Sequence, residues 1–274
     1  MAPVPFAICN EIYRDWSLAD ACAHAAKVGY DAIELAPFTL APRITDLSAT
    51  ERGRIRETVE RAGLEVAGLH WLLAQTEGFH VTHPDAGVRA QTAAYLRALV
   101  VAGGEMGGRV LVFGSPKQRS LMPGVSPEQA WGWATEVFRD AVREGEDRGV
   151  TLCMEPLAPS ETDFINTAAE ARRFAAQFGS PAMKIILDVK AMSSEATPLE
   201  QIVRESAGVF AHFHANDPNL KGPGFGEVDF RPIASVLREV GYGGYVSVEV
   251  FRFEEGAEAI AAQSRENLRA AFGE

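Results

Sequence analysis

Residues 147–156, with the sequence DRGVTLCMEP, contain the pattern that decides the fold. A polar, helix-like segment ends at Gly149, the run VTLCM is apolar and suits a buried strand, and Glu155 follows directly. A glycine between a helix and a strand lets the backbone adopt a positive φ angle at low cost. The stretch is therefore typical of one repeating unit of an α/β protein with a parallel sheet.

The same helix–glycine–strand pattern recurs along the chain. Gly29 in KVGYDAIEL, Gly63 in RAGLEVAGL and Gly241 in EVGYGGYVSV each separate a helix-like segment from a strand-like one. Most of the strand candidates are short apolar runs, as in parallel strands that are buried on both faces. The eight strand candidates lie near residues 4–9, 31–35, 65–70, 109–113, 150–155, 184–188, 208–214 and 245–250.

The segments between these strands carry the signals of helix starts. Ser48–Glu51 and Thr167–Glu170 have the spacing of capping boxes, and Ser126 is followed by a proline. The long irregular segments follow strands and precede helices, which predicts elaborated loops at the C-terminal ends of the strands. The length of 274 residues is close to the ~250 residues of an eight-stranded α/β barrel. We therefore predict one (β/α)8 TIM-barrel domain over residues 1–274.

Composition excludes several classes of protein. A formal net charge of −11 argues against a nucleic-acid-binding protein, because such proteins present clustered Lys and Arg. The cysteines at 9, 22 and 153 are odd in number and lie in apolar segments, which predicts reduced, packed thiols. No apolar run reaches the length of a membrane span, and the N-terminal residues lack the pattern of a secretion signal. We expect a cytoplasmic protein without membrane contact.

Four side chains of types that commonly bind metal ions lie at the ends of the last four predicted strands. They are Glu155 in TLCMEP, Asp188 in IILD, His214 in VFAHFH and Glu249 in YVSVEV. In a barrel these strands are consecutive, so their side chains can converge on one point. Carboxylate oxygens with one imidazole suit a hard divalent cation, so we predict one bound Mn²⁺, Mg²⁺ or Co²⁺.

The whole chain, and these four segments above all, resembles the xylose-isomerase-like barrels, which include sugar isomerases and epimerases. The segment HFHANDPNLKGPGFGEVDF, residues 212–230, is similar to that family's His-x-His stretch followed by Pro-Gly-x-Gly. The resemblance implies that Glu155, Asp188, His214 and Glu249 bind the metal ion. It also implies that Glu155 and Glu249 are the catalytic acid and base, one on each face of a sugar. A homodimer or homotetramer is expected from the resemblance.

The chain departs from the ketose 3-epimerase pattern at two positions. Ala191 stands where a His three residues after the metal-binding Asp is expected, and Leu220 stands where an Arg six residues after the metal-binding His is expected. Lys190 and Lys221 lie beside these positions, so we expect them to serve as cationic donors to the substrate.

Further residues near strand ends are candidates for contact with the substrate. They include the cations of the segment LVFGSPKQRSL and the aromatic residues of GLHWLL. His212 lies two residues before His214 and so points to the same side of its strand. The additional substrate-binding candidates are Glu34, His70, Trp71, Lys117, Arg119 and His212.

Removing a proton beside a carbonyl leaves an enediolate, whose charge a divalent cation stabilises while two carboxylates act as base and acid. This chemistry predicts an isomerase or epimerase for a small carbohydrate-like substrate or keto-polyol. A metal-dependent lyase, such as a dehydratase or an enzyme that eliminates from keto-glycosides, is the alternative on the same scaffold. A DNA-repair endonuclease and a non-catalytic binding barrel are weaker alternatives, the former because it needs many more metal ligands and a basic face.

Overall fold

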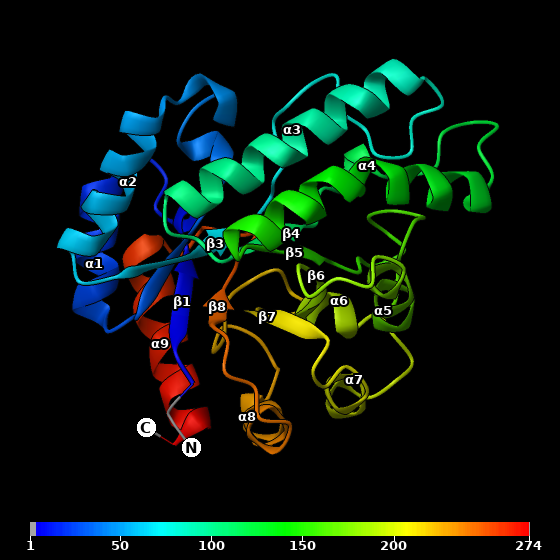
Figure 1. The fold of residues 1–274 in the computed structure, drawn as a ribbon. Helices are drawn as coiled ribbons and strands as arrows, with labels where there is room; N and C mark the ends of the chain where they lie inside the picture. Colours follow the sequence, from blue (N-terminus) through cyan, green and yellow to red (C-terminus); the bar gives the residue numbers. More distant parts are fainter. Residues whose placement is uncertain (1–3, 274) are drawn as a thin grey trace.

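The structure, a computed structural model, describes residues 4–273 and is built around a closed barrel of parallel strands (Figure 1). Neighbouring strands follow the order of the chain, and β1 pairs with β8 to close the barrel. Each strand predicted from the sequence is present, and its ends lie within two residues of the prediction. The strands are β1 (Phe6–Cys9), β2 (Ala32–Leu35), β3 (Glu65–Leu69), β4 (Val110–Phe113), β5 (Thr151–Met154), β6 (Met183–Asp188), β7 (Phe210–Ala215) and β8 (Val246–Val248).

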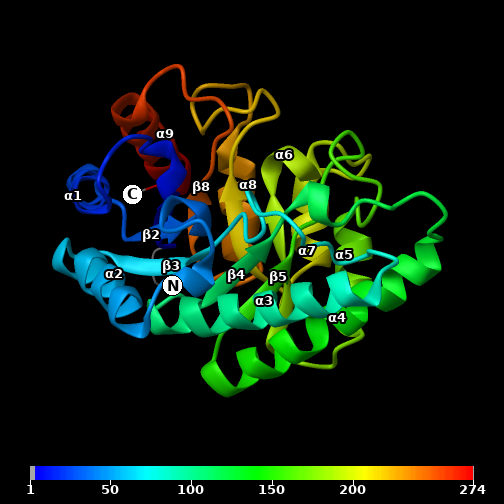
Figure 2. The ribbon, with the colours of Figure 1, turned by 90° about the horizontal axis from the view of Figure 1, so that it is seen from above.

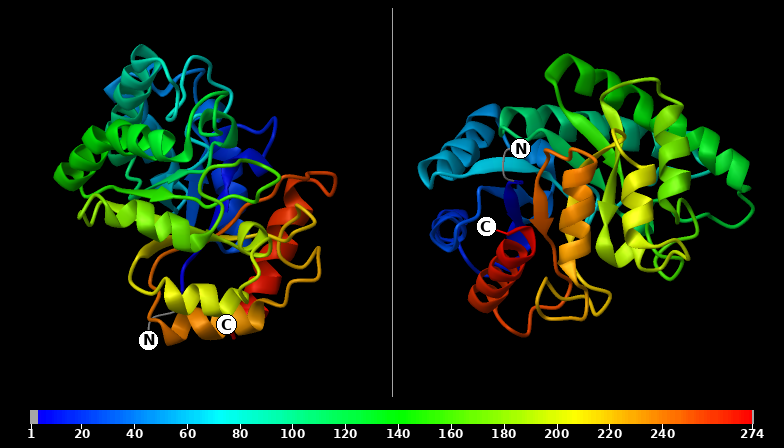
Figure 3. Two further views of the ribbon diagram at one scale, coloured as in Figure 1. Left: turned by 90° about the vertical axis from the view of Figure 1, so that its right-hand side faces the viewer. Right: turned by 90° about the horizontal axis from the view of Figure 1, so that it is seen from below.

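Helices surround the barrel, as the views from above and from below show (Figures 2 and 3). The α-helices are α1 (Leu18–Val28), α2 (Ala49–Arg61), α3 (Ala86–Glu105), α4 (Pro127–Arg148), α5 (Ala168–Ala176), α6 (Val189–Met192), α7 (Leu199–Glu205), α8 (Phe230–Glu239) and α9 (Ala257–Phe272). Short 3-10 helices are η1 (Asn10–Ile12), η2 (Pro37–Thr39), η3 (Ile44–Asp46) and η4 (Pro116–Gln118). The fold is thus the predicted single (β/α)8 TIM barrel.

The local signals act as the sequence indicated. Ser48 and Thr167 accept hydrogen bonds from the backbone of Glu51 and Glu170, and both capping boxes are complete. Gly149 ends α4 with a φ angle of 65°, which a side chain would disfavour. These caps and turns set where each helix stops and the next strand begins.

The two faces of the strands form separate cores. The large cluster between strands and helices includes residues such as Phe6, Ile33 and Leu152. Inside the barrel, Ala7, Ala32 and Ala67 form a small cluster of their own. Since side chains alternate along a strand, the next inward positions after Ala7 and Ala32 lie two residues on, at the C-terminal end of the barrel.

Long loops leave the C-terminal ends of the strands, as predicted, and short turns enter the N-terminal ends. The segments between β3 and α3 and between β7 and α8 are long, whereas β5 begins soon after α4 ends. Helix α9 lies beside β1 (Figure 1), and the rings of Phe6 and Phe272 meet edge-on with centroids 5.2 Å apart. Among residues 4–273, none of the helices combines the length and apolar character that crossing a membrane requires.

Candidate metal centre and active site

The four predicted metal ligands meet at the C-terminal end of the barrel. One donor atom from each of Glu155, Asp188, His214 and Glu249 lies within 4.8 Å of every other. All four side chains are at least 97% buried, with Glu155 the most exposed at 3%. Three carboxylates packed this closely in a buried place require a compensating charge. The cluster can therefore hold a divalent metal ion.

Hydrogen bonds hold the carboxylate of Asp188 at the end of β6. Its Oδ1 accepts from the backbone N–H of Ala191 at 2.7 Å, and its Oδ2 accepts from Nδ2 of Asn216 at 2.5 Å. The same Nδ2 atom of Asn216 lies 3.4 Å from Oε2 of Glu249. The side-chain oxygen of Asn216 accepts a hydrogen bond from the backbone N–H of Lys190. Asn216 therefore orients two of the four candidate ligands at once.

His214 presents one ring nitrogen to the cluster and the other to Glu34. Its Nε2 lies 3.3 Å from both carboxylate oxygens of Glu34. Its Nδ1 lies 3.1 Å from Oε2 of Glu249 and 3.9 Å from Oδ2 of Asp188, yet makes no well-aligned hydrogen bond within the described chain. A metal-binding histidine commonly donates its second N–H to a carboxylate in this way. Together with the hard carboxylate donors, this buried nitrogen fits a metal ion.

The two candidate acid–base carboxylates experience opposite electrostatic environments. Burial, together with the nearby charges of Glu249 and Asp188, raises the pKa of Glu155 to about 8. Burial also acts to raise the pKa of Glu249, but His214, together with the charges of His70 and Lys190, outweighs it and lowers that pKa to about 2. Paired carboxyl groups whose environments separate their pKa values are suited to act as acid and base.

A cavity of about 350 Å³ opens beside this cluster, and we call it the catalytic pocket. Its wall includes residues that follow β3, β4, β5, β6 and β8, so the pocket lies on the predicted face of the barrel. Its lining includes Trp71, Lys117, Glu155, Glu161, Lys190 and Phe251. Glu249 is not part of this lining, and the indole N–H of Trp71 donates to its Oε1.

Two of the predicted cationic contacts reach the catalytic pocket. Lys117 is exposed on its rim, and Lys190 lines it while donating to Glu161 at 2.9 Å. The ammonium group of Lys190 also lies 4.1 Å from the centre of the Phe251 ring. Lys221 is paired with Glu255 and is not part of the pocket lining, so its predicted substrate contact stays a prediction.

Four other predicted substrate contacts are buried and are not part of the lining of the catalytic pocket. Arg119 is fully buried and donates to the backbone carbonyls of Glu155 and Ile165. Residues without any exposed surface are Glu34, His70 and His212. Their polar atoms are engaged by partners within the protein: Arg119 by backbone carbonyls, His70 by Glu11, and His212 by Glu34.

Glu34, His70 and His212 form a polar network with His214 beside the candidate metal centre. His212 lies 2.8 Å from Oε2 of Glu34, so His212 and His214 share one side of β7 as predicted. The nitrogen Nε2 of His70 lies 2.8 Å from Oε2 of Glu11. The burial of Glu34 is offset by these histidines, which hold its pKa well below the usual range.

Sequence reasoning missed three functional neighbours. Asn216 could have been found, because it stands two residues after His214 and the alternation of a strand places it on the same side. Glu161 and Glu11 carry no such signal, since each lies in an irregular segment or a short 3-10 helix. Their partners, Lys190 and His70, are distant in sequence and are brought close only by the fold.

The sequence pattern of one protein family, described as xylose isomerase-like TIM barrel, matches residues 22–271. The chain belongs to this family. D-psicose 3-epimerase of Agrobacterium fabrum (strain C58) is 28% identical over 231 residues, 82% of this chain and 76% of that protein. A 3-dehydro-D-guloside 4-epimerase of Escherichia coli (strain K12) is 33% identical over 112 residues, 40% of this chain and 43% of that protein.

A solved structure shares the same overall fold. The crystal structure of a D-psicose 3-epimerase in the presence of D-fructose superposes with a TM-score of 0.85 at 21% identity, covering 99% of this chain and all of that one (100%). At this identity the likeness concerns the fold alone. Because the named relatives are epimerases of sugars, the comparisons favour the predicted sugar isomerase or epimerase over the predicted lyase.

Proposed function

We propose that this xylose isomerase-like barrel is a metal-dependent epimerase that inverts a carbon beside the carbonyl of a ketose or keto-sugar. One observation carries the proposal: the donor atoms of Glu155, Asp188, His214 and Glu249 converge within 4.8 Å at the mouth of the barrel. Epimerisation beside a carbonyl needs an electrophile and two proton-transferring groups, and this cluster contains residues for both.

The donor set of three carboxylates and one imidazole suits one hard divalent cation, Mn²⁺, Mg²⁺ or Co²⁺. Such a cation, when bound, would polarise the carbonyl and so acidify the neighbouring C–H bond. His214 Nδ1 would be the nitrogen donor to this ion, because its Nε2 faces Glu34. The remaining donors are oxygens of Glu155, Asp188 and Glu249.

Glu249 and Glu155 are the proton-transferring pair. Glu249 is the base that takes the proton from the carbon, and Glu155 delivers a proton to the opposite face. Glu155 lines the catalytic pocket, and Glu249 accepts a hydrogen bond from the indole of Trp71, which also lines it. Inversion requires both, because a single group on one face can only return the proton to that face.

The substrate is a small carbohydrate. A pocket of about 350 Å³ accommodates a monosaccharide, and Lys117 and Lys190 can donate hydrogen bonds to its oxygens. The indole of Trp71 and the ring of Phe251 form an apolar wall. The relatives named for epimerising psicose and a 3-dehydro-guloside support this class of substrate. The dimer or tetramer, and the cytoplasmic location, stay predictions.

Deuterium exchange tests the proposal. The Mn²⁺-loaded protein is incubated in D₂O with a panel of ketoses and 3-keto-glycosides, and the products are examined by NMR. We expect deuterium at the carbon beside the carbonyl, together with the epimer, for at least one sugar. Glu155→Gln should bind the substrate but lose epimer formation.

Two outcomes would overturn the proposal. The first is the absence of exchange with every sugar of the panel in a protein that has bound Mn²⁺. The second is an unsaturated product that absorbs in the ultraviolet, since it would show elimination and so favour the lyase.

A further inference from the structure

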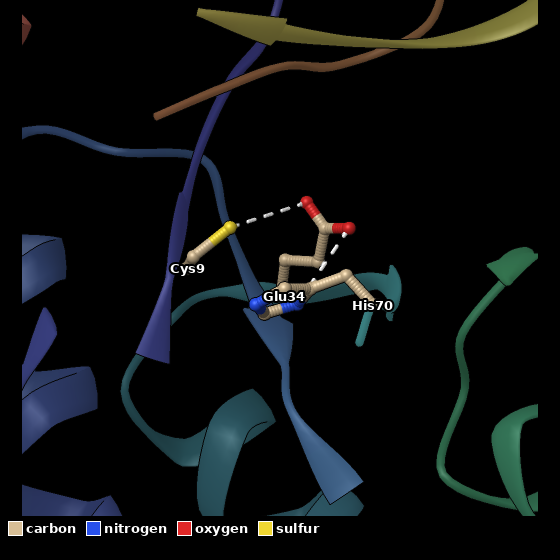
Figure 4. Close-up of side chains that lie close together, drawn as sticks. All are labelled: Cys9, Glu34 and His70. Carbon is tan, nitrogen blue, oxygen red and sulfur yellow. Dashed lines mark hydrogen bonds and ion pairs between the residues drawn. The ribbon is translucent and has the colours of Figure 1, made fainter. Parts of the chain in front are cut away.

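A second group of potential metal ligands lies on the other side of the barrel mouth. Cys9 ends β1, Glu34 lies in β2 and His70 directly follows β3, and Figure 4 shows the three side chains together. One donor atom from each lies within 4.8 Å of the other two. None of the three has exposed surface. This group, which we call the thiol cluster, shares no donor residue with the four-residue cluster of β5–β8.

The spacing within the thiol cluster matches that of ligands around one tetrahedral ion. Cys9 and Glu34 are direct partners across the β1–β2 pairing, and Sγ lies 3.7 Å from Oε2. Nδ1 of His70 lies 3.8 Å from Oε1 of Glu34. Ligands at zinc–sulfur and zinc–oxygen or zinc–nitrogen bond lengths stand about 3.3–3.6 Å apart in a tetrahedron. Small shifts of these side chains would bring them to an ion.

The orientation of His70 is the independent indication of a ligand. Its Nε2 is held by Oε2 of Glu11 at 2.8 Å, which fixes the ring. Its Nδ1 is fully buried and makes no hydrogen bond within the described chain, although it faces Glu34. A carboxylate that holds one nitrogen of a histidine while the other stays free is the arrangement around metal-binding histidines.

We propose that the thiol cluster binds a second metal ion, Zn²⁺, through Cys9 Sγ, a carboxylate oxygen of Glu34 and His70 Nδ1. Sulfur, nitrogen and oxygen donors together suit zinc, whereas the donors of the β5–β8 cluster are harder. Binding converts the Cys9 thiol to a thiolate and releases its proton to solvent. Three protein ligands leave a fourth position for a water molecule.

Glu34 connects the two clusters. Besides facing Cys9 and His70, its carboxylate lies 3.3 Å from Nε2 of His214. An ion on Glu34 would therefore act on the orientation of His214. The inference does not depend on the reaction proposed above, because it concerns binding alone.

Cobalt provides the test, since a thiolate bound to Co²⁺ produces a ligand-to-metal absorption in the near ultraviolet and oxygen and nitrogen donors do not. Metal-free protein is titrated with Co²⁺ and the bound metal is counted by elemental analysis. We expect two ions per chain and the thiolate absorption. Cys9→Ser should bind one ion and lose the absorption. The control Cys22→Ser removes another fully buried thiol and should behave as the unchanged protein.

Two further variants keep the test decisive. If Cys9→Ser does not fold, as judged by circular dichroism, His70→Gln should weaken binding of the thiolate-bound ion at least tenfold. Glu249→Gln should lose the other ion and retain the thiolate absorption. The proposal is overturned if the unchanged protein shows no thiolate absorption with Co²⁺, or if Cys9→Ser or a folded His70→Gln retains it at full strength.

Discussion

Trp71 donates its indole N–H to Oε1 of Glu249 across 2.7 Å, although the two residues are 178 positions apart in the chain. Phe38 and Phe251 stack against the indole, with ring centroids 5.9 and 5.8 Å away. Trp71 also has a φ angle of 51°, in the left-handed region. For a residue other than glycine this conformation costs on the order of 1–3 kcal/mol, so the surrounding contacts must hold it.

Trp71→Phe should leave the carboxylate of Glu249 poorly positioned for proton transfer, while the candidate metal site stays occupied. The variant keeps the aromatic packing but removes the donor to Glu249, and a hydrogen bond to a charged group contributes about 1.5–3 kcal/mol. We expect kcat to fall about 10- to 100-fold, with bound Mn²⁺ unchanged. Trp133→Phe, on α4 under Arg89, is the matched control and should leave kcat unchanged. A Trp71→Phe enzyme with full kcat would contradict this role.

Gly114→Ala should displace the carboxylate of Glu155. A Cβ at Gly114 would stand 2.0 Å from Oε2 of Glu155, so the side chain must move. We expect turnover to fall at least 100-fold, in line with the ~1 Å misplacement that costs that much in catalysis. The melting temperature should change little, because the displaced atom ends a flexible side chain.

Gly132→Ala is the control for that substitution. Gly132 lies within α4, and a Cβ there meets nothing within 4 Å. We expect full activity and a gain of about 0.5–1 kcal/mol in unfolding free energy from helix propensity. Equal loss of activity in both glycine variants would refute the role of Gly114.

Substitution of Arg119 should lower stability, whereas substitution of Lys117, two residues earlier, should weaken substrate binding. Arg119→Met removes buried bonds to the carbonyls of Glu155 and Ile165, which should lower the unfolding free energy by about 2–3 kcal/mol. Lys117→Met should leave stability unchanged and raise KM, since Lys117 is exposed on the pocket rim. Urea denaturation and steady-state kinetics measure the two effects. A stable Arg119→Met protein with a raised KM would restore Arg119 as a substrate contact.

Asn216→Ala should reduce metal affinity. The amide nitrogen of Asn216 lies 2.5 Å from Asp188 and 3.4 Å from Glu249. Loss of such an orienting residue typically lowers metal affinity 10- to 100-fold, which isothermal titration with Mn²⁺ measures. Asn219→Ala, in the same loop but bonded to the carbonyl of Phe225, should keep the affinity. Identical affinities for both variants would count against the role of Asn216.

Asp229 should contribute to acid stability at the start of α8. Hydrogen bonds from Arg231 lower its pKa from 3.8 to about 2. Because the folded-state pKa lies below the unfolded one, its ionisation stabilises the fold above about pH 4, and this contribution is lost as the pH falls towards 2. In Asp229→Asn, urea midpoints should therefore decline less between pH 4 and pH 2 than in the unchanged protein. Parallel declines would argue against the ion pair.

The four candidate metal ligands could be predicted from the sequence, because each strand of a barrel ends at an equivalent position on the same rim. Glu155, Asp188, His214 and Glu249 each follow the apolar run of a consecutive strand, and closure of the barrel brings equivalent positions to one rim. The same reasoning could not place Arg119, since its guanidinium turns inward to the carbonyl of Glu155 instead of outward to the cavity. The sequence LVFGSPKQRSL does not indicate whether the side chain of Arg119 points into the protein or into the cavity.

The sequence by itself determined the barrel, its eight strand–helix units and the residues at the C-terminal ends of the strands. These features depend on the spacing of apolar residues, on glycine turns and on helix caps, all of which are local in the chain. Tertiary structure alone decided which polar residues face the pocket and which pair with one another beneath it. Glu34 is fully buried among His70, His212 and His214, and Trp71 covers Glu249. Those pairings join residues from strands far apart in the chain, so the packing of the closed barrel selects them.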